Sequence, residues 1–197
     1  VYKRQFPVGG VSMIVGDSTD VSASFTGACA YSSFTDYMGN CGTGNSIGVG
    51  GKGVTATGSY AFDSGISLAG GLSSPQSGLV GNTADVYGIE AAYTADSYGL
   101  SLAFVSDDGG LGTSTEYLGL NGYYSFDAVD VSVGIESEST PTTDESGYFL
   151  GLTFPEVGAG SLSVGLGTTD NFASSAEETF TYEASYSYPV NDGMTIT

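Results

Sequence analysis

The stretch Val54-Thr55-Ala56-Thr57-Gly58-Ser59-Tyr60-Ala61-Phe62 places apolar or small residues at its even positions, between Thr55, Thr57 and Ser59. Alternation of this kind over several residues predicts a β-strand with one polar and one apolar face. The tight link Asp63-Ser64-Gly65 follows, and a second alternating stretch, Ile66–Leu72, comes directly after it. The two stretches therefore predict an antiparallel hairpin.

The same period-two pattern recurs along the chain, and no window shows a helical period of comparable length. An all-β fold class is therefore predicted. The pattern predicts eleven strands: Val11–Val15, Val54–Phe62, Ile66–Leu72, Tyr87–Tyr93, Leu100–Phe104, Leu118–Phe126, Val131–Ile135, Tyr148–Phe154, Leu162–Leu166, Phe180–Tyr188 and Met194–Thr197.

The connections between these strands alternate in length. Tight turns such as Asp127-Ala128-Val129-Asp130 alternate with longer polar loops such as Ser73–Asp85 and Ser137–Gly147. Transmembrane β-barrels have short periplasmic turns, long outer loops and, as single bacterial chains, an even number of strands. We therefore predict an antiparallel transmembrane β-barrel, of which this chain is a fragment of about eleven strands.

Residues 1–197 are expected to form part of one β-barrel domain, with no second domain. Residues 1–5 contain Lys3 and Arg4 and fit poorly with the sequence that follows. We interpret these five residues as translated adapter sequence, with a native start as the alternative.

The charge balance excludes several classes of protein. The net charge is −19, and Lys3, Arg4 and Lys52 are the only basic residues. Nucleic acid is excluded as a partner because its recognition needs a basic surface. The sequence has no His and no G-x-S-x-G motif, so nothing would activate a nucleophilic serine. The chain is therefore not expected to be an enzyme or to bind a cofactor.

The polar face of the predicted strands carries three carboxylates, Glu90, Glu136 and Glu183. If the apolar face contacts lipid, these glutamates face the lumen, and we predict them as pore-lining residues that favour cations. Arginine at Leu120 or Ile135 is then expected to prevent assembly, whereas Ser101→Arg on the polar face is expected to be tolerated. Aromatic residues just before the short turns predict an interfacial girdle: Tyr60, Phe62, Tyr93, Tyr124, Phe126, Phe154, Tyr186 and Tyr188.

The longest connection, Asp17–Ser46, contains Cys29 and Cys41, which are the only two cysteines. Two cysteines in one loop of an exported protein predict a disulfide, with two free thiols or a metal site as alternatives. A zinc site lacks further Cys or His ligands, so no metal site is predicted. The bridge would restrict a loop that either folds into the pore or caps it.

Several turns resemble those of a known family, the cyanobacterial outer-membrane porins of the carbohydrate-selective OprB type, also called iron-uptake porins. The most specific similarity is in the last hairpins, which contain Phe154-Pro155-Glu156-Val157-Gly158-Ala159-Gly160-Ser161-Leu162 and Tyr186-Ser187-Tyr188-Pro189-Val190-Asn191-Asp192-Gly193-Met194-Thr195-Ile196-Thr197. Phe6-Pro7-Val8-Gly9-Gly10 is similar to another turn of the family.

The resemblance implies that the barrel is porin-like and that residues 1–197 are part of a porin β-barrel domain. It further implies an outer-membrane porin with a passive, water-filled channel for small hydrophilic solutes such as sugars, ions or inorganic iron. The expected partners are outer-membrane lipid, those solutes and, in a homotrimer, further copies of the chain. Two alternatives stay open from the residues alone: a non-channel outer-membrane barrel or surface adhesin, and a soluble secreted β-protein.

Overall fold

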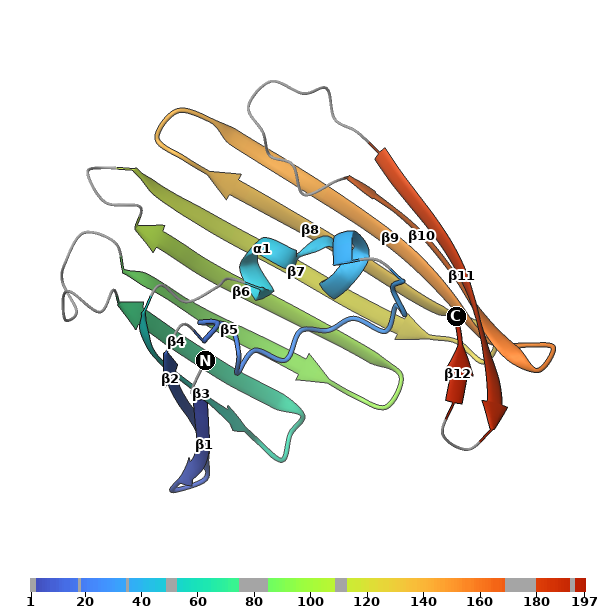
Figure 1. The fold of residues 1–197 in the computed structure, drawn as a ribbon, viewed down its shortest axis with the longest axis horizontal. Helices are drawn as coiled ribbons and strands as arrows, with labels where there is room; N and C mark the ends of the chain where they lie inside the picture. Colours follow the sequence, from blue (N-terminus) through green and yellow to red (C-terminus); the bar gives the residue numbers. More distant parts are fainter. Residues whose placement is uncertain are drawn as a thin grey trace.

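A computed structural model describes residues 3–17, 19–34, 36–48, 53–74, 85–108, 113–168, 180–191 and 194–197. Twelve antiparallel strands form one sheet in which each strand pairs with its neighbours in the chain (Figure 1). The strands are β1 (Lys3–Val8), β2 (Val11–Asp17), β3 (Val54–Ala61), β4 (Ile66–Ser74), β5 (Val86–Thr94), β6 (Tyr98–Asp108), β7 (Ser114–Ser125), β8 (Asp130–Ser139), β9 (Asp144–Val157), β10 (Gly160–Thr168), β11 (Phe180–Asn191) and β12 (Met194–Ile196).

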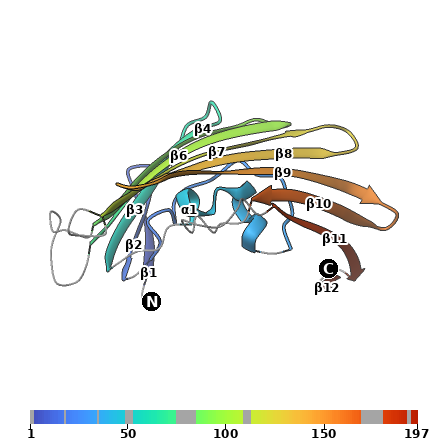
Figure 2. The ribbon, with the colours of Figure 1, turned by 90° about the horizontal axis from the view of Figure 1, so that it is seen from above.

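The sheet is strongly curved, as Figure 2 shows from above. A short 3-10 helix, η1 (Asp36–Gly42), and one turn of α-helix, α1 (Gly44–Ile47), lie on its concave side. Within the described residues, β1 and β12 are the two edge strands, so this part of the barrel wall is an open trough. No helix in the described ranges is long and apolar enough to cross a membrane.

All eleven predicted strands are present, and β1 is a twelfth that the pattern missed. It pairs with β2 from Lys3 opposite Gly16 to Val8 opposite Val11. Pro7 and the charges at Lys3 and Arg4 obscure its alternation. Proline cannot donate to a ladder, and it is tolerated here because β1 lies at the edge of the described sheet.

The predicted apolar face lies on the convex side of the sheet. Leu120 and Ile135, which are cross-strand neighbours in β7 and β8, remain 40 % and 48 % exposed. A surface of this kind suits hydrocarbon, because strand pairing satisfies the backbone while the outward side chains remain apolar.

Aromatic rings gather at the short-turn end of the same convex face. The ring centroids of Tyr60 and Phe62 are 4.7 Å apart, and those of Tyr124 and Phe126 are 4.6 Å apart. Tyr98, which follows a short turn and was not predicted, lies 6.4 Å from Tyr124 in a stacked pair. These contacts confirm the clustering of rings at one end that an interfacial girdle requires.

The expectation that Ser101→Arg would be tolerated is wrong. Its side chain is on the concave face, but it is 1 % exposed and its hydroxyl donates to Asn121 Oδ1 at 2.6 Å. Chain folded onto the concave face covers this position, so an arginine would have no room there.

We expect Leu120→Arg and Ile135→Arg to abolish assembly, because an arginine on the lipid face costs about 2–4 kcal/mol near the bilayer centre. Ser67→Arg is the control, since Ser67 is a partly exposed residue of the polar face of β4. Heat-modifiable gel mobility would report folding. Equal folding of all three variants would contradict the assignment of the convex face to lipid.

Candidate functional site

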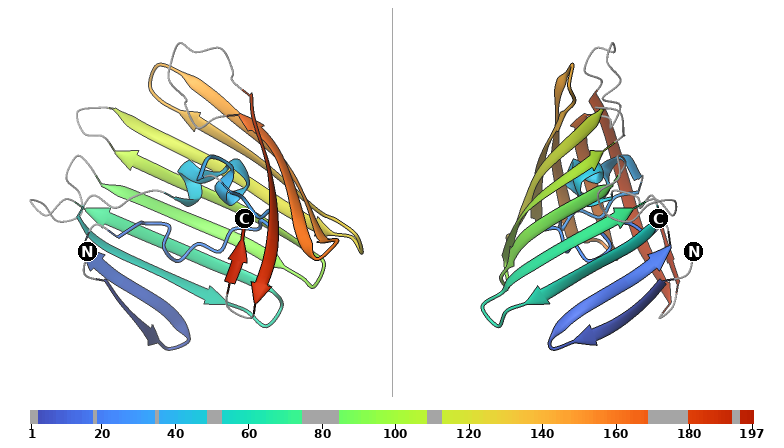
Figure 3. Two further views of the ribbon diagram at one scale, coloured as in Figure 1. Left: turned by 45° about the vertical axis from the view of Figure 1, so that its right-hand side comes forward. Right: turned by 90° about the vertical axis from the view of Figure 1, so that its left-hand side faces the viewer.

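Residues 19–34 and 36–48 are here called the inner segment. The segment follows β2, includes η1 and α1, and lies along the concave face of the sheet. Both views of Figure 3 show the segment on this side, between the strands at the two ends of the sheet. The segment does not join the sheet as a strand, so its backbone groups need partners other than a ladder.

Side chains of the wall supply these partners along the first limb, residues 26–34. Alternate backbone N–H groups point to the wall and donate to an oxygen of a different strand. The donors and acceptors are Thr26 to Glu90 at 2.6 Å, Ala28 to Asn121 at 2.7 Å, Ala30 to Ser132 at 3.2 Å, Ser32 to Thr153 at 3.4 Å and Phe34 to Glu183 at 3.0 Å. The limb therefore crosses the sheet from β5 to β11, and the N–H of every second residue from Thr26 to Phe34 has an acceptor on a strand.

The strands between these acceptors also take part. Ser101 of β6 donates to Asn121 at 2.6 Å, and the hydroxyls of Thr153 and Ser163 of β10 are 3.2 Å apart. The wall thus presents a row of oxygen acceptors, two of which also bond to hydroxyl groups of neighbouring strands. Because buried N–H groups need a partner, this row determines where the limb can lie.

Asn121 links the first limb to residues 36–48, here called the returning limb. Its Oδ1 accepts from the Ala28 N–H, while its Nδ2 donates to Thr43 Oγ1 at 2.8 Å and to the Asn40 carbonyl at 3.3 Å. On the same side, the Ser46 N–H donates to Glu136 Oε1 at 2.5 Å.

The three glutamates predicted as pore-lining residues therefore have a different environment from the one expected. Glu90 is 4 % exposed and Glu136 is 0 % exposed, because the inner segment covers both. The Glu90 carboxylate accepts from two consecutive N–H groups, of Thr26 and Gly27, at 2.6 and 2.7 Å. Glu183 is half-buried and accepts from Phe34 and from the Tyr31 hydroxyl. These carboxylates hold the segment rather than face open solvent.

Tyr31 reinforces the contact with Glu183. Its hydroxyl donates to Glu183 Oε1 at 2.8 Å, and its ring packs edge-on against Phe149 with centroids 5.1 Å apart. Burial and the hydrogen bond to the Glu183 carboxylate raise the pKa of Tyr31 above its ordinary value, so the hydroxyl stays protonated and remains a donor.

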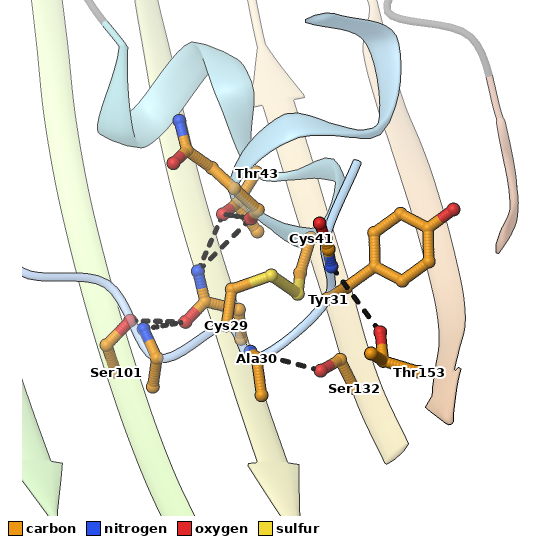
Figure 4. The surroundings of a disulfide bond; sticks show 12 residues. Cys29, Ala30, Tyr31, Cys41, Thr43, Ser101, Ser132 and Thr153 are labelled. Atoms are coloured by element: carbon orange, nitrogen blue, oxygen red, sulfur yellow. Dashed lines mark hydrogen bonds between the residues drawn. A yellow bond between two sulfur atoms is a disulfide. The ribbon is translucent and has the colours of Figure 1, made fainter. Parts of the chain in front are cut away.

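A disulfide joins Cys29 of the first limb to Cys41 of the returning limb, with the Cα atoms 5.7 Å apart. Figure 4 shows the bond between the two limbs, above the wall residues Ser132 and Thr153. Asn40, Cys41 and Gly42 are all left-handed, with φ of 52°, 54° and 70°. Non-glycine residues in this region cost of order 1–3 kcal/mol each, so the surrounding contacts must hold this turn.

Glycines on the concave face let the inner segment approach the wall. A methyl group at any of seven of them would come closer than ordinary contact to residues of the segment. These glycines, with the segment residues opposite, are Gly71 (Val21), Gly88 (Phe25), Gly99 (Ala28), Gly119 (Ser46), Gly134 (Cys41), and Gly151 and Gly165 (both Tyr31). The glycines therefore form a groove shaped to the segment.

Two apolar clusters fill the space between the segment and the wall. One contains Val21, Val86 and Val105, and the other contains Tyr31, Met38, Cys41 and Phe149. Val86, Val105 and Phe149 are apolar residues on the otherwise polar face of the strands. Together with the glycines, these exceptions to the alternation are the sequence signal that could have located the segment.

Within the described ranges, no group of three or more His, Cys, Asp or Glu side chains is placed to hold a metal ion.

We expect Gly134→Ala to destabilise the folded protein by about 1–3 kcal/mol, the usual cost of overpacking, because the new methyl group would overlap the Cys41 carbonyl oxygen. Gly70→Ala is the control, since its nearest neighbour would be at 3.5 Å. Unfolding in urea, monitored as loss of the heat-modifiable band, would measure the stability of both variants. Equal midpoints would show that the groove does not constrain the segment.

Glu90→Gln should loosen the first limb, because an amide offers one oxygen acceptor where the carboxylate offers two. An unsatisfied buried N–H costs roughly 1–3 kcal/mol, so exchange of the Thr26 and Gly27 amides should accelerate about tenfold or more. Hydrogen exchange of a peptide spanning residues 25–28 would measure this, with Glu145→Gln as the control. Unchanged protection would contradict the role of Glu90.

Comparison with known proteins is consistent with this geometry. A porin structure refined at 1.8 Å resolution superposes with a TM-score of 0.70 at 18% identity, covering 97% of this chain and 71% of that one. A triple mutant of Rhodopseudomonas blastica porin gives a TM-score of 0.63 at 17% identity, covering 98% and 68%. No curated protein matches the sequence significantly. The sequence itself matches the Gram-negative porin family over residues 6–197, so the chain belongs to this family of outer-membrane channel proteins.

Proposed function

We propose that this chain forms the wall of a passive, water-filled channel for small hydrophilic solutes and ions, narrowed by the inner segment. The observation that carries the proposal is the fixation of that segment on the concave face by acceptors from β5, β7, β8, β9 and β11. A segment fixed inside a barrel narrows the lumen to the same extent for every solute, which suits passive diffusion.

Carboxylates near the long-loop end of the concave face support a preference for cations. Glu138 lies opposite Glu145 in the β8–β9 register and opposite Tyr117 in the β7–β8 register. Both glutamates are partly exposed. A passage lined by one sign of charge concentrates counter-ions. These residues would therefore contribute more to ion preference than Glu90 and Glu136, which the inner segment buries.

The solutes and the assembly are further parts of the proposal. The resemblance of the last hairpins to carbohydrate-selective porins supports sugars, ions and inorganic iron as the candidate transported solutes. The same resemblance supports a homotrimer. The non-channel barrel or adhesin is the second hypothesis, and it differs from the first in having no stable single-channel conductance.

The proposed channel should be mildly cation-selective, as judged by reversal potentials across a KCl gradient in planar bilayers. Replacing Glu138 and Glu145 by Gln should lower this preference, whereas Glu156→Gln, at the short-turn end, serves as the control. The preference should weaken in high salt, because the Debye length falls to about 3 Å at 1 M. A chloride preference in the intact porin would contradict the prediction.

A further inference from the structure

Two ties hold the returning limb of the inner segment close to the first limb. One is the Cys29–Cys41 disulfide, and the other is Asn121, which bonds to Ala28 on one limb and to Asn40 and Thr43 on the other. The two ties act at nearly the same place, since Ala28 precedes Cys29 and Asn40 precedes Cys41. The disulfide is the covalent one.

The chain at the second end of the disulfide is in a conformation that it would not adopt unaided. Asn40 and Cys41 have left-handed φ values without being glycine, which disfavours both residues. Cys41 is completely buried, and its carbonyl oxygen packs against Gly134 of β8. The turn therefore depends on contacts that keep it pressed against the wall.

Movement of this turn has one free direction. The wall of β7 and β8 blocks it on one side, where Gly119 and Gly134 are already in close contact with Ser46 and Cys41. The other side is the concave space of the barrel (Figure 2). A turn that leaves the wall must consequently enter the passage.

We infer that the Cys29–Cys41 disulfide is a latch that keeps the turn at residues 40–42 against the wall and prevents it from moving further into the passage, so that conductance depends on the redox state of this bond. The inference rests on the proposed channel function. Reduction releases the strained turn at residues 40–42, which then leaves Gly134 and intermittently obstructs the lumen.

A low-molecular-weight dithiol is the reductant that the step needs. Its thiolate attacks the sulfur of Cys29, the more exposed of the two cysteines, and the Cys29–Cys41 bond breaks as a mixed disulfide forms. The second thiolate of the reagent then attacks this mixed disulfide. Two electrons and two protons pass to the protein, which ends with two thiols, while the reagent becomes a cyclic disulfide.

The test is single-channel recording on the intact porin, folded and inserted with the disulfide intact, before and after dithiothreitol. Alkylation and mass spectrometry would verify that both thiols form. Reduction should increase current noise, add transient closures and lower the mean conductance. Unchanged conductance and noise after verified reduction would overturn the latch, whereas no conductance in either state would instead refute the channel function.

The Cys29→Ser/Cys41→Ser variant should show the same added closures without reductant, and dithiothreitol should then have no further effect on it. Asn121→Ala tests whether the two ties act in parallel. Groups in one network are non-additive, so loss of both ties should raise the closed-to-open dwell ratio beyond the product of the single effects, by a factor of about 2 or more. If the double loss changed the dwell ratio only by the product of the two single effects, the disulfide and Asn121 would not be holding the same turn.

Discussion

The hydrogen-bonding requirement of the inner segment is the constraint on which the interior of this protein depends. Strands satisfy their own backbone by pairing, but the segment crosses the strands without joining the ladder. Its N–H groups must therefore find side-chain acceptors, since a buried N–H without a partner is costly. Glu90, Asn121, Ser132, Thr153 and Glu183 meet this need from five strands. The polar face of the sheet is accordingly a binding surface for the protein's own chain.

Shape and hydrogen bonding act together on that surface. An acceptor can reach a backbone N–H only if the backbone comes close to the wall, and the glycines of the groove allow that approach. Gly134 illustrates the dependence, because it receives the Cys41 carbonyl while its cross-strand neighbour Asn121 bonds to Ala28 and Thr43. A larger residue at such a position would separate donors from acceptors nearby. The abundance of glycine therefore has a structural role inside the barrel.

The sequence allowed the strands, the lipid face and the aromatic end to be predicted, because all three follow from period-two alternation. β1 was missed, since Pro7 and two charges obscure its pattern and edge pairing tolerates them. The interior could not be predicted in the same way. Alternation assigns Ser101 and Glu136 to the polar face but says nothing about what covers that face. Val86, Val105 and Phe149 were the available clues, as apolar residues where small or polar ones prevail.

Burial also changes how the carboxylates of the interior act. A charge that accepts from two N–H groups, as Glu90 does, is stabilised by fixed dipoles and is separated from passing ions by the segment above it. Glu138 and Glu145 lie face to face on neighbouring strands and are partly exposed. Like charges in that arrangement repel each other, which is the basis of the proposed preference for cations. The same residue type thus fixes the inner segment at one level of the wall and forms a partly exposed pair of like charges at another.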